Sequence, residues 1–168
     1  STIQQFNNST IQRFNDSTIQ RFNDSTIQPS TLNQKPMSKQ QYKQQNIDFL
    51  ISKRQEPDVS ELTKGILYKV IKSGNGEGKI TLGNVVCCYY KGSLINGRVF
   101  DNTFTQGYPE ALRVKDLIVG FQIALEYMHI GDRWIVYIPS ELGYGSKTND
   151  DIPGNSTLTF EIEVVSVM

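Results

Sequence analysis

Apolar and polar positions alternate along much of the chain, and this pattern predicts β-strands. Every second residue from Leu158 to Val164 is apolar, and the residues between them are Thr or Glu. Such alternation is typical of a strand with one buried and one solvated face. On this and on β-branched and aromatic content, five strands are predicted, over 66–72, 85–94, 98–103, 132–139 and 157–167. Asn96-Gly97 lies between the second and third strands and is a strong signal for a hairpin turn.

The spacing of apolar residues changes from every second position to helical spacing between residues 117 and 127, where a helix is predicted. Ile118, Phe121 and Leu125 recur at helical spacing, and Met128 continues the row. One short helix and about five antiparallel strands indicate an α+β fold in which the helix covers the sheet.

A second helix is predicted over 39–54, a segment that contains neither Pro nor Gly. Ser38 is a favourable N-cap, and Pro57 ends the pattern. The apolar residues of this segment form only an irregular stripe. Two interpretations remain open: the helix packs on its own domain, or it is an arm through which the protein forms a weak dimer instead of a monomer.

The N-terminal segment repeats with a period of eight, because Ser-Thr-Ile-Gln begins at residues 1, 9, 17 and 25. Solenoid units need about 20 residues or more, and eight does not match a coiled-coil heptad. The abundance of Gln, Asn, Ser and Thr is typical of disorder. An adhesive tail is one interpretation. We favour a solvated tail, or translation of repeated DNA upstream of a true start at Met37.

The chain is therefore expected to have three parts. These are a low-complexity repeat tail (1–36), a short helical arm with a linker (37–61) and a β-rich domain (62–168).

Composition and charge exclude several classes of function. The 168 residues include 17 basic and 17 acidic side chains, whereas a nucleic-acid-binding surface is normally basic and clustered. There is no apolar run long enough for a transmembrane helix and no visible signal peptide. We therefore expect neither nucleic acid nor membrane as a partner.

The two cysteines, Cys87 and Cys88, are neighbours on a predicted strand, so their side chains point to opposite faces. We expect one buried and one solvent-side thiol instead of a redox pair. Free thiols are easier to keep in a reducing compartment. The predicted location is therefore cytoplasmic, or periplasmic if the true N-terminus is missing.

Residue types also limit the chemistry. The only histidine, His129, lies in a predicted turn, so a nucleophile would lack a positioned base. One His and two adjacent Cys cannot supply a zinc site. The glycines at 74, 76 and 78 lack the Lys-Ser/Thr of a phosphate-binding loop. No cofactor and no metal is expected. Glu161 and Glu163 share one strand face, which we interpret as solvated.

Four segments, 85–101, 117–121, 133–145 and 152–163, resemble the FKBP-type peptidyl-prolyl isomerases, and the likeness runs in unbroken order over about 62–167. The flank 62–72 resembles the bacterial branch with an N-terminal helical arm. The resemblance implies a twisted antiparallel sheet wrapped on a short helix, with the site between them. It also implies an isomerase that assists protein folding, proline-containing polypeptides as substrates and macrolides as inhibitors. A non-catalytic proline-binding or chaperone module on the same fold is the alternative.

The resemblance also assigns residues to the site. Ile118 would donate its backbone N–H, and Tyr144 its phenol O–H, to substrate carbonyls. The implied catalytic residues are Tyr90, Phe100, Asp101, Ile118, Phe121, Tyr144 and Phe160, and the implied substrate-binding residues are Leu112, Leu117 and Ile152.

The sequence departs from the family pattern at four positions. Phe121 stands where the pocket floor usually has Trp, and Leu112 where many members have Phe. Gln106 replaces an Arg that often partners the pocket Asp, so Asp101 is expected to be held differently. Asp151 stands where an apolar residue is common.

Overall fold

The computed structural model describes residues 35–168, so the repeat tail expected over 1–36 lies outside the described residues except for its last two. Ser38–Met168 form one compact unit. Within the part of the chain that the structure describes, no helix has the length and hydropathy needed to cross a membrane.

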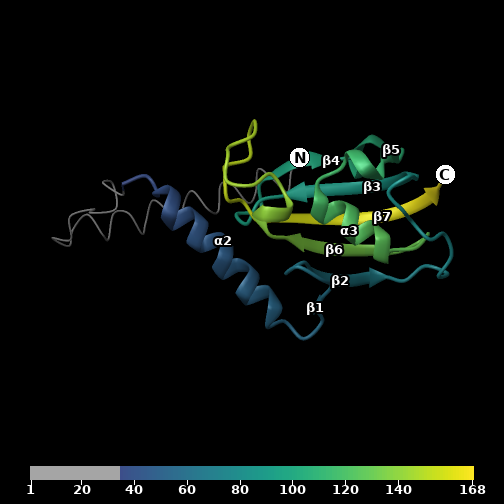
Figure 1. Cartoon of the computed structure of the whole chain (residues 1–168), viewed down its shortest axis with the longest axis horizontal. Coiled ribbons are helices and arrows are strands. Elements are labelled where there is room, and N and C mark those ends of the chain that lie inside the picture. The colour runs from purple at the N-terminus through teal and green to yellow at the C-terminus, as the bar shows by residue number, and fades with distance from the viewer. Residues whose placement is uncertain (1–34) are drawn as a thin grey trace, which may run out of the picture. The chain divides into compact units, whose positions relative to one another are not determined.

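The unit is built on one antiparallel sheet, in which the strands lie in the order β1-β2-β6-β7-β3-β4 and β5 pairs with β3 (Figure 1). All five predicted strands are present. The prediction of about five was short by two, because β1 has only two residues and because β5, unlike the equally short β4, follows no Asn-Gly turn signal. The strands are β1 (Ser60–Glu61), β2 (Leu67–Lys72), β3 (Val85–Ser93), β4 (Val99–Asn102), β5 (Glu110–Arg113), β6 (Arg133–Ile138) and β7 (Leu158–Val167).

The predicted hairpin turn joins β3 to β4. Gly97 has a φ of 85°, a left-handed conformation that glycine adopts without steric cost, and its N–H donates to the Leu94 carbonyl at 2.9 Å. The pairing of β3 with β4 shifts register between Gly92 and Ser93. The turn brings Phe100 and Asp101 back beside β3.

Helix α3 (Val119–Tyr127) lies across one face of the sheet (Figure 1). Its buried residues include Phe121 and Leu125, as the helical spacing predicts. Gly120 allows the close approach, since a Cβ there would lie 2.4 Å from the Ile138 side chain of β6. The helix begins two residues later than predicted, so Ile118 is extended at its N-terminal end.

Helix α2 (Lys39–Arg54) begins at the predicted N-cap. Ser38 and Gln41 form a reciprocal capping box, in which each side chain accepts from the backbone N–H of the other. The rings of Phe49 and Tyr137 meet edge to face at 6.0 Å. The helix therefore packs on its own domain, the first of the two interpretations, and a dimer through residues 39–54 stays a prediction.

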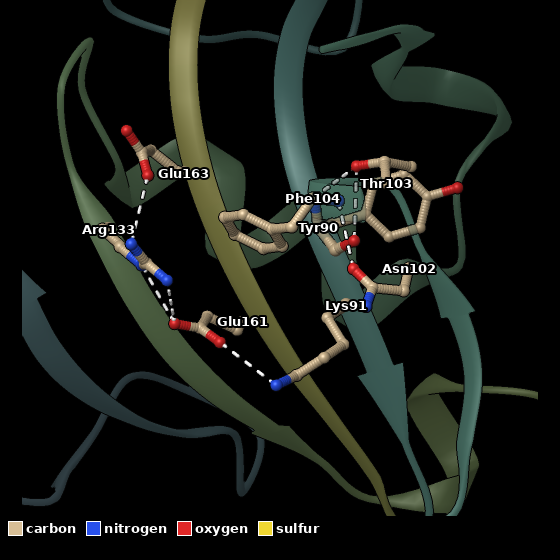
Figure 2. Close-up of polar contacts among 8 residues, drawn as sticks. All are labelled: Tyr90, Lys91, Asn102, Thr103, Phe104, Arg133, Glu161 and Glu163. Atoms are coloured by element: carbon tan, nitrogen blue, oxygen red, sulfur yellow. Dashed lines mark hydrogen bonds and ion pairs between the residues drawn. The ribbon is translucent and has the colours of Figure 1, made fainter. Parts of the chain in front are cut away.

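The face of the sheet opposite α3 carries cross-strand ion pairs (Figure 2). The Arg133 guanidinium lies 2.7 Å from one Glu161 oxygen and 3.6 Å from Glu163, and the Lys91 ammonium lies 3.6 Å from Glu161. Glu161 and Glu163 are both partly exposed, so the interpretation of a solvated face was incomplete and not wrong, since sequence alternation does not reveal the basic side chains on neighbouring strands. These pairs connect β6, β7 and β3.

The two thiols of β3 are free, Cys88 buried and Cys87 partly exposed, as predicted. Burial is the main cause that raises the pKa of the Cys88 thiol to about 12. The reactive thiolate of Cys88 is therefore scarce at neutral pH.

We expect iodoacetamide at neutral pH to alkylate Cys87 in the native protein and to leave Cys88 unmodified. Unfolding in urea exposes both thiols, so the intact mass should then show two additions. Cys87→Ser should abolish labelling of the native protein. Two rapid additions to the native wild-type chain would contradict the burial of Cys88.

Candidate functional site

A cavity of about 440 Å³ opens between the sheet, the start of α3 and the loop that precedes β7. Every residue that the sequence assigned to the site lines it. These are Tyr90, Phe100, Asp101, Leu112, Leu117, Ile118, Phe121, Tyr144, Ile152 and Phe160. Four further lining residues, which those assignments left out, are Asp116, Asn149, Asp150 and Asp151.

The floor of the cavity is an edge-to-face aromatic cluster. Phe121 of α3 lies 5.1 Å from Phe160 of β7 and 5.8 Å from Tyr90 of β3, measured between ring centroids. Phe100 of β4 meets Phe160 at 5.7 Å with nearly perpendicular rings. Such pairs are stabilising beyond the area they bury. Phe121 is only 3% exposed and Phe160 only 4%, so a bound apolar group would rest on a rigid floor.

Gly92 of β3 lies against this floor. A Cβ at this position would lie 2.6 Å from Cζ of Phe100 and 2.7 Å from Cε1 of Phe160. Any larger residue would therefore displace two rings that line the cavity.

The carboxylate of Asp101 is held by Tyr90, whose phenol O–H donates to Oδ2 at 2.7 Å. Burial and, next, this hydrogen bond raise the pKa of Tyr90, so the phenol remains a donor at neutral pH. Gln106 does not take the place of the missing Arg. Its amide donates to the Tyr108 carbonyl at 3.0 Å and to Glu110 at 3.2 Å. Among residues 35–168, the side chain that bonds the Asp101 carboxylate is therefore that of Tyr90.

Two hydrogen-bond donors lie in the lining. Ile118 is extended just before α3, and its N–H has no acceptor among residues 35–168. Tyr144 follows Gly143 in the loop before β7 and is 38% exposed. Burial, followed by the charges of Asp101 and Asp150, raises the pKa of the Tyr144 phenol. Both groups can therefore donate to carbonyl oxygens of a bound peptide at neutral pH.

The four additional lining residues lie beside predicted ones in the sequence. Asp116 precedes Leu117, and the run Asn149-Asp150-Asp151 precedes Ile152. Arg98, in the turn after β3, donates to the backbone carbonyl of Asp151. The acidic run was visible in the sequence, but its placement at the cavity depends on how the loop folds back.

The cavity offers apolar surface and donors, and not a nucleophile paired with a base. His129 lies outside it, with Nδ1 3.8 Å from a carboxylate oxygen of Asp132. Residues 35–168 contain no group of three or more His, Cys, Asp or Glu side chains placed to bind a metal ion. The arrangement is suited to hold an apolar ring and to orient the peptide groups around it.

Comparisons with known proteins agree with this geometry. A family model described as FKBP-type peptidyl-prolyl cis-trans isomerase matches residues 76–165. The isomerase FkpA of Buchnera aphidicola subsp. Schizaphis graminum is 42% identical over 109 residues, which are 65% of this chain and 43% of that protein. The isomerase Mip of Coxiella burnetii is 38% identical over 120 residues, 71% of this chain and 52% of that protein. The chain spans about half the length of these relatives.

Solved structures show the same likeness. The crystal structure of FkpA from Escherichia coli has a TM-score of 0.72 and 27% identity, and the match covers 98% of this chain and 71% of that one. A peptidyl-prolyl cis-trans isomerase from Pseudomonas syringae has a TM-score of 0.72 and 30% identity, with 80% and 98% covered.

One comparison corrects the predicted location. A relative from Legionella longbeachae, 37% identical over 120 residues that are 71% of this chain and 51% of that protein, is named outer membrane protein MIP. The cytoplasmic location predicted from the free thiols is wrong, because such relatives point away from the cytoplasm. Two free cysteines show only that they are not joined in a disulfide, and this says little about the compartment in which the protein is located.

Gly92→Ala should destabilise the protein by about 1–3 kcal/mol, because the added methyl group overlaps the rings of Phe100 and Phe160. Urea unfolding followed by the fluorescence of Trp134, the only tryptophan, measures the loss. Gly83→Ala is the matched control, since nothing lies within 4 Å of a Cβ there. Equal stability of the two variants would contradict the close packing at Gly92.

Proposed function

Because the chain belongs to the family of FKBP-type peptidyl-prolyl cis-trans isomerases, we propose that it catalyses the cis-trans isomerisation of X-Pro bonds in polypeptides and so assists protein folding. The observation that carries the proposal is the cavity with an aromatic floor, whose lining includes the phenol of Tyr144 and the N–H of Ile118, which has no acceptor within the described residues 35–168. This lining suits a proline ring flanked by peptide carbonyls.

The reaction requires no covalent chemistry. Resonance keeps the peptide bond planar and sets a rotation barrier of about 18–20 kcal/mol. A perpendicular amide loses that resonance, and its carbonyl becomes less polar. The aromatic floor of the cavity favours the less polar, twisted form over the planar ground state, and this differential binding accelerates the reaction.

Each lining group has a role in this mechanism. Phe121 and Phe160 support the proline ring, while Ile118 N–H and Tyr144 O–H bind carbonyls on either side and fix the backbone. The hydrogen bond from Tyr90 keeps the Asp101 carboxylate at a constant position near the rotating bond. The enzyme then supplies shape, desolvation and orientation.

The same cavity is our proposed site for macrolide inhibitors, because its volume of about 440 Å³ lies within the range of small-molecule pockets. The second candidate function is a non-catalytic proline-binding or chaperone module. Two features favour this alternative because both change the surroundings of the rotating bond: Phe121 stands in place of Trp, and no Arg within residues 35–168 is paired with Asp101.

The described chain should accelerate isomerisation of a proline-containing tetrapeptide, measured by a protease-coupled or NMR exchange assay. Tyr144→Phe and Asp101→Ala should each lower kcat/KM about 5- to 10-fold, the effect of losing a single hydrogen bond or charge of about 1–1.5 kcal/mol.

Tyr127→Phe is the matched control for Tyr144→Phe, since Tyr127 is an exposed tyrosine of α3 outside the cavity lining. A folded chain that binds the peptide but does not accelerate its isomerisation would reject the enzyme and support the binding module.

The carboxylates of the lining predict a charge preference. Asp101, Asp116, Asp150 and Asp151 line the cavity, and among the described residues no Lys or Arg does so. Peptides with Lys next to proline should therefore show a kcat/KM about 2- to 5-fold above those with Glu, as expected for partly exposed charge pairs. High salt and the double variant Asp150→Asn, Asp151→Asn should each reduce the ratio. A ratio that is insensitive to salt would contradict this electrostatic origin.

A further inference from the structure

The helix α2 and the loop before β7 are joined by a buried polar contact. Asn46 of α2 is 2% exposed and Thr157 is 2% exposed. The Asn46 Oδ1 atom accepts from the Thr157 N–H at 2.7 Å, and the Thr157 hydroxyl donates to the Asn46 carbonyl at 3.2 Å. The Asn46 amide group in turn donates to the Tyr42 carbonyl at 2.8 Å. Buried polar groups are costly unless they are paired in this way.

A second hydrogen bond runs parallel to the first. The Tyr42 and Ser156 hydroxyl oxygens are 2.7 Å apart, and the Ser156 hydroxyl donates its proton to the Pro153 carbonyl at 2.6 Å. Since the Ser156 proton is already used, the Tyr42 O–H is the donor in the contact between them. Helix α2 thus contacts two successive residues, Ser156 and Thr157.

Both contacts hold chain segments that are adjacent to residues of the cavity lining. The loop of residues 144–155, which we name the flap, contains Tyr144 and Ile152 of the lining. Pro153, the acceptor of the Ser156 hydroxyl, directly follows Ile152. The N–H of Asn155, the residue before Ser156, donates to the Gly145 carbonyl at 2.8 Å, and Gly145 directly follows Tyr144.

Apart from these bonds, the flap is attached where Arg98 donates to the Asp151 carbonyl and where the Gly145 N–H donates to the Ser140 carbonyl at 2.8 Å. The Ile152 side chain is 7% exposed and belongs to the buried core. A loop without regular secondary structure depends on such individual contacts, and the loss of one favours local opening. When contacts with α2 hold the base of the flap, the flap has fewer conformations before a peptide binds. Less free energy is then lost in ordering it on binding.

We propose that Asn46 and Tyr42 are positioning residues for the proline cavity, because they clamp the base of the flap and thereby place Tyr144 and Ile152. This inference rests on the proposed function for the identity of the bound peptide. The helix α2 is then part of the machinery of the site although none of its residues lines the cavity.

The test uses the full chain with Asn46→Ala, which removes both amide contacts, and Gln45→Ala as the matched control on the exposed side of the same helix. Hydrogen exchange should become about 5- to 10-fold faster at the amides of Gly145, Ile152 and Asn155. Exchange at Val136 in β6 should stay as in the wild type. The Kd for a proline tetrapeptide, from NMR titration, should rise about 3- to 10-fold.

Tyr42→Phe should produce a smaller change in the same direction, and it keeps the test valid if Asn46→Ala does not fold. Flap exchange and Kd equal to those of Gln45→Ala would overturn the inference. Faster flap exchange with an unchanged Kd would also overturn it, since the clamp would then not affect the cavity. If the wild-type chain binds the peptide but does not accelerate its isomerisation, only the proposed enzyme activity is rejected. The positioning role of Asn46 and Tyr42 is judged separately, by hydrogen exchange and by Kd.

Discussion

The structure depends on one apolar contact, between the first turn of α3 and the inner face of the sheet. Phe121 and Phe160 lie 5.1 Å apart in this contact, and both are almost fully buried. The hydrophobic effect that holds the helix on the sheet therefore also builds the floor of the cavity. Gly120 and Gly92 permit this contact, because side chains at either position would separate the helix from β6 or displace the rings above β3.

The polar groups of the cavity come from a helix end, a short strand and a loop. The N–H of Ile118 has no acceptor in the part of the chain that the structure describes, because Ile118 precedes the first turn of α3, where backbone donors lack intrahelical acceptors. Asp101 lies on the short strand β4 and is held by Tyr90 of β3. Tyr144 lies in a loop, and α2 reaches the base of that loop through Asn46 and Tyr42. The cavity thus combines a buried aromatic floor with polar groups, such as Asp101 and Tyr144, whose positions depend on hydrogen bonds from other elements.

The errors of the sequence-based predictions have physical causes. The strand β1 was missed because two residues do not establish a period, and β5 because its four residues, unlike the four of β4, follow no Asn-Gly turn signal. The ion pairs of Glu161 and Glu163 were not predicted because their basic partner on the neighbouring strand, Arg133, is 28 residues away from Glu161 in the chain. The location was wrong because unpaired cysteines describe the redox state of the chain and carry little information about where the protein works.

The sequence by itself determined five of the seven described strands, the two described α-helices, the hairpin turn at Gly97 and, through family resemblance, ten of the residues that line the cavity. These follow from local periodicity, capping and motif spacing, which act between residues close in the chain. Only the tertiary structure decided that Tyr90 holds Asp101 in place of an Arg, that the acidic run 149–151 reaches the cavity, and that Asn46 of α2 bonds Thr157. Those contacts join segments that are distant in sequence, and their geometry is set by how the sheet, the helices and the flap pack together.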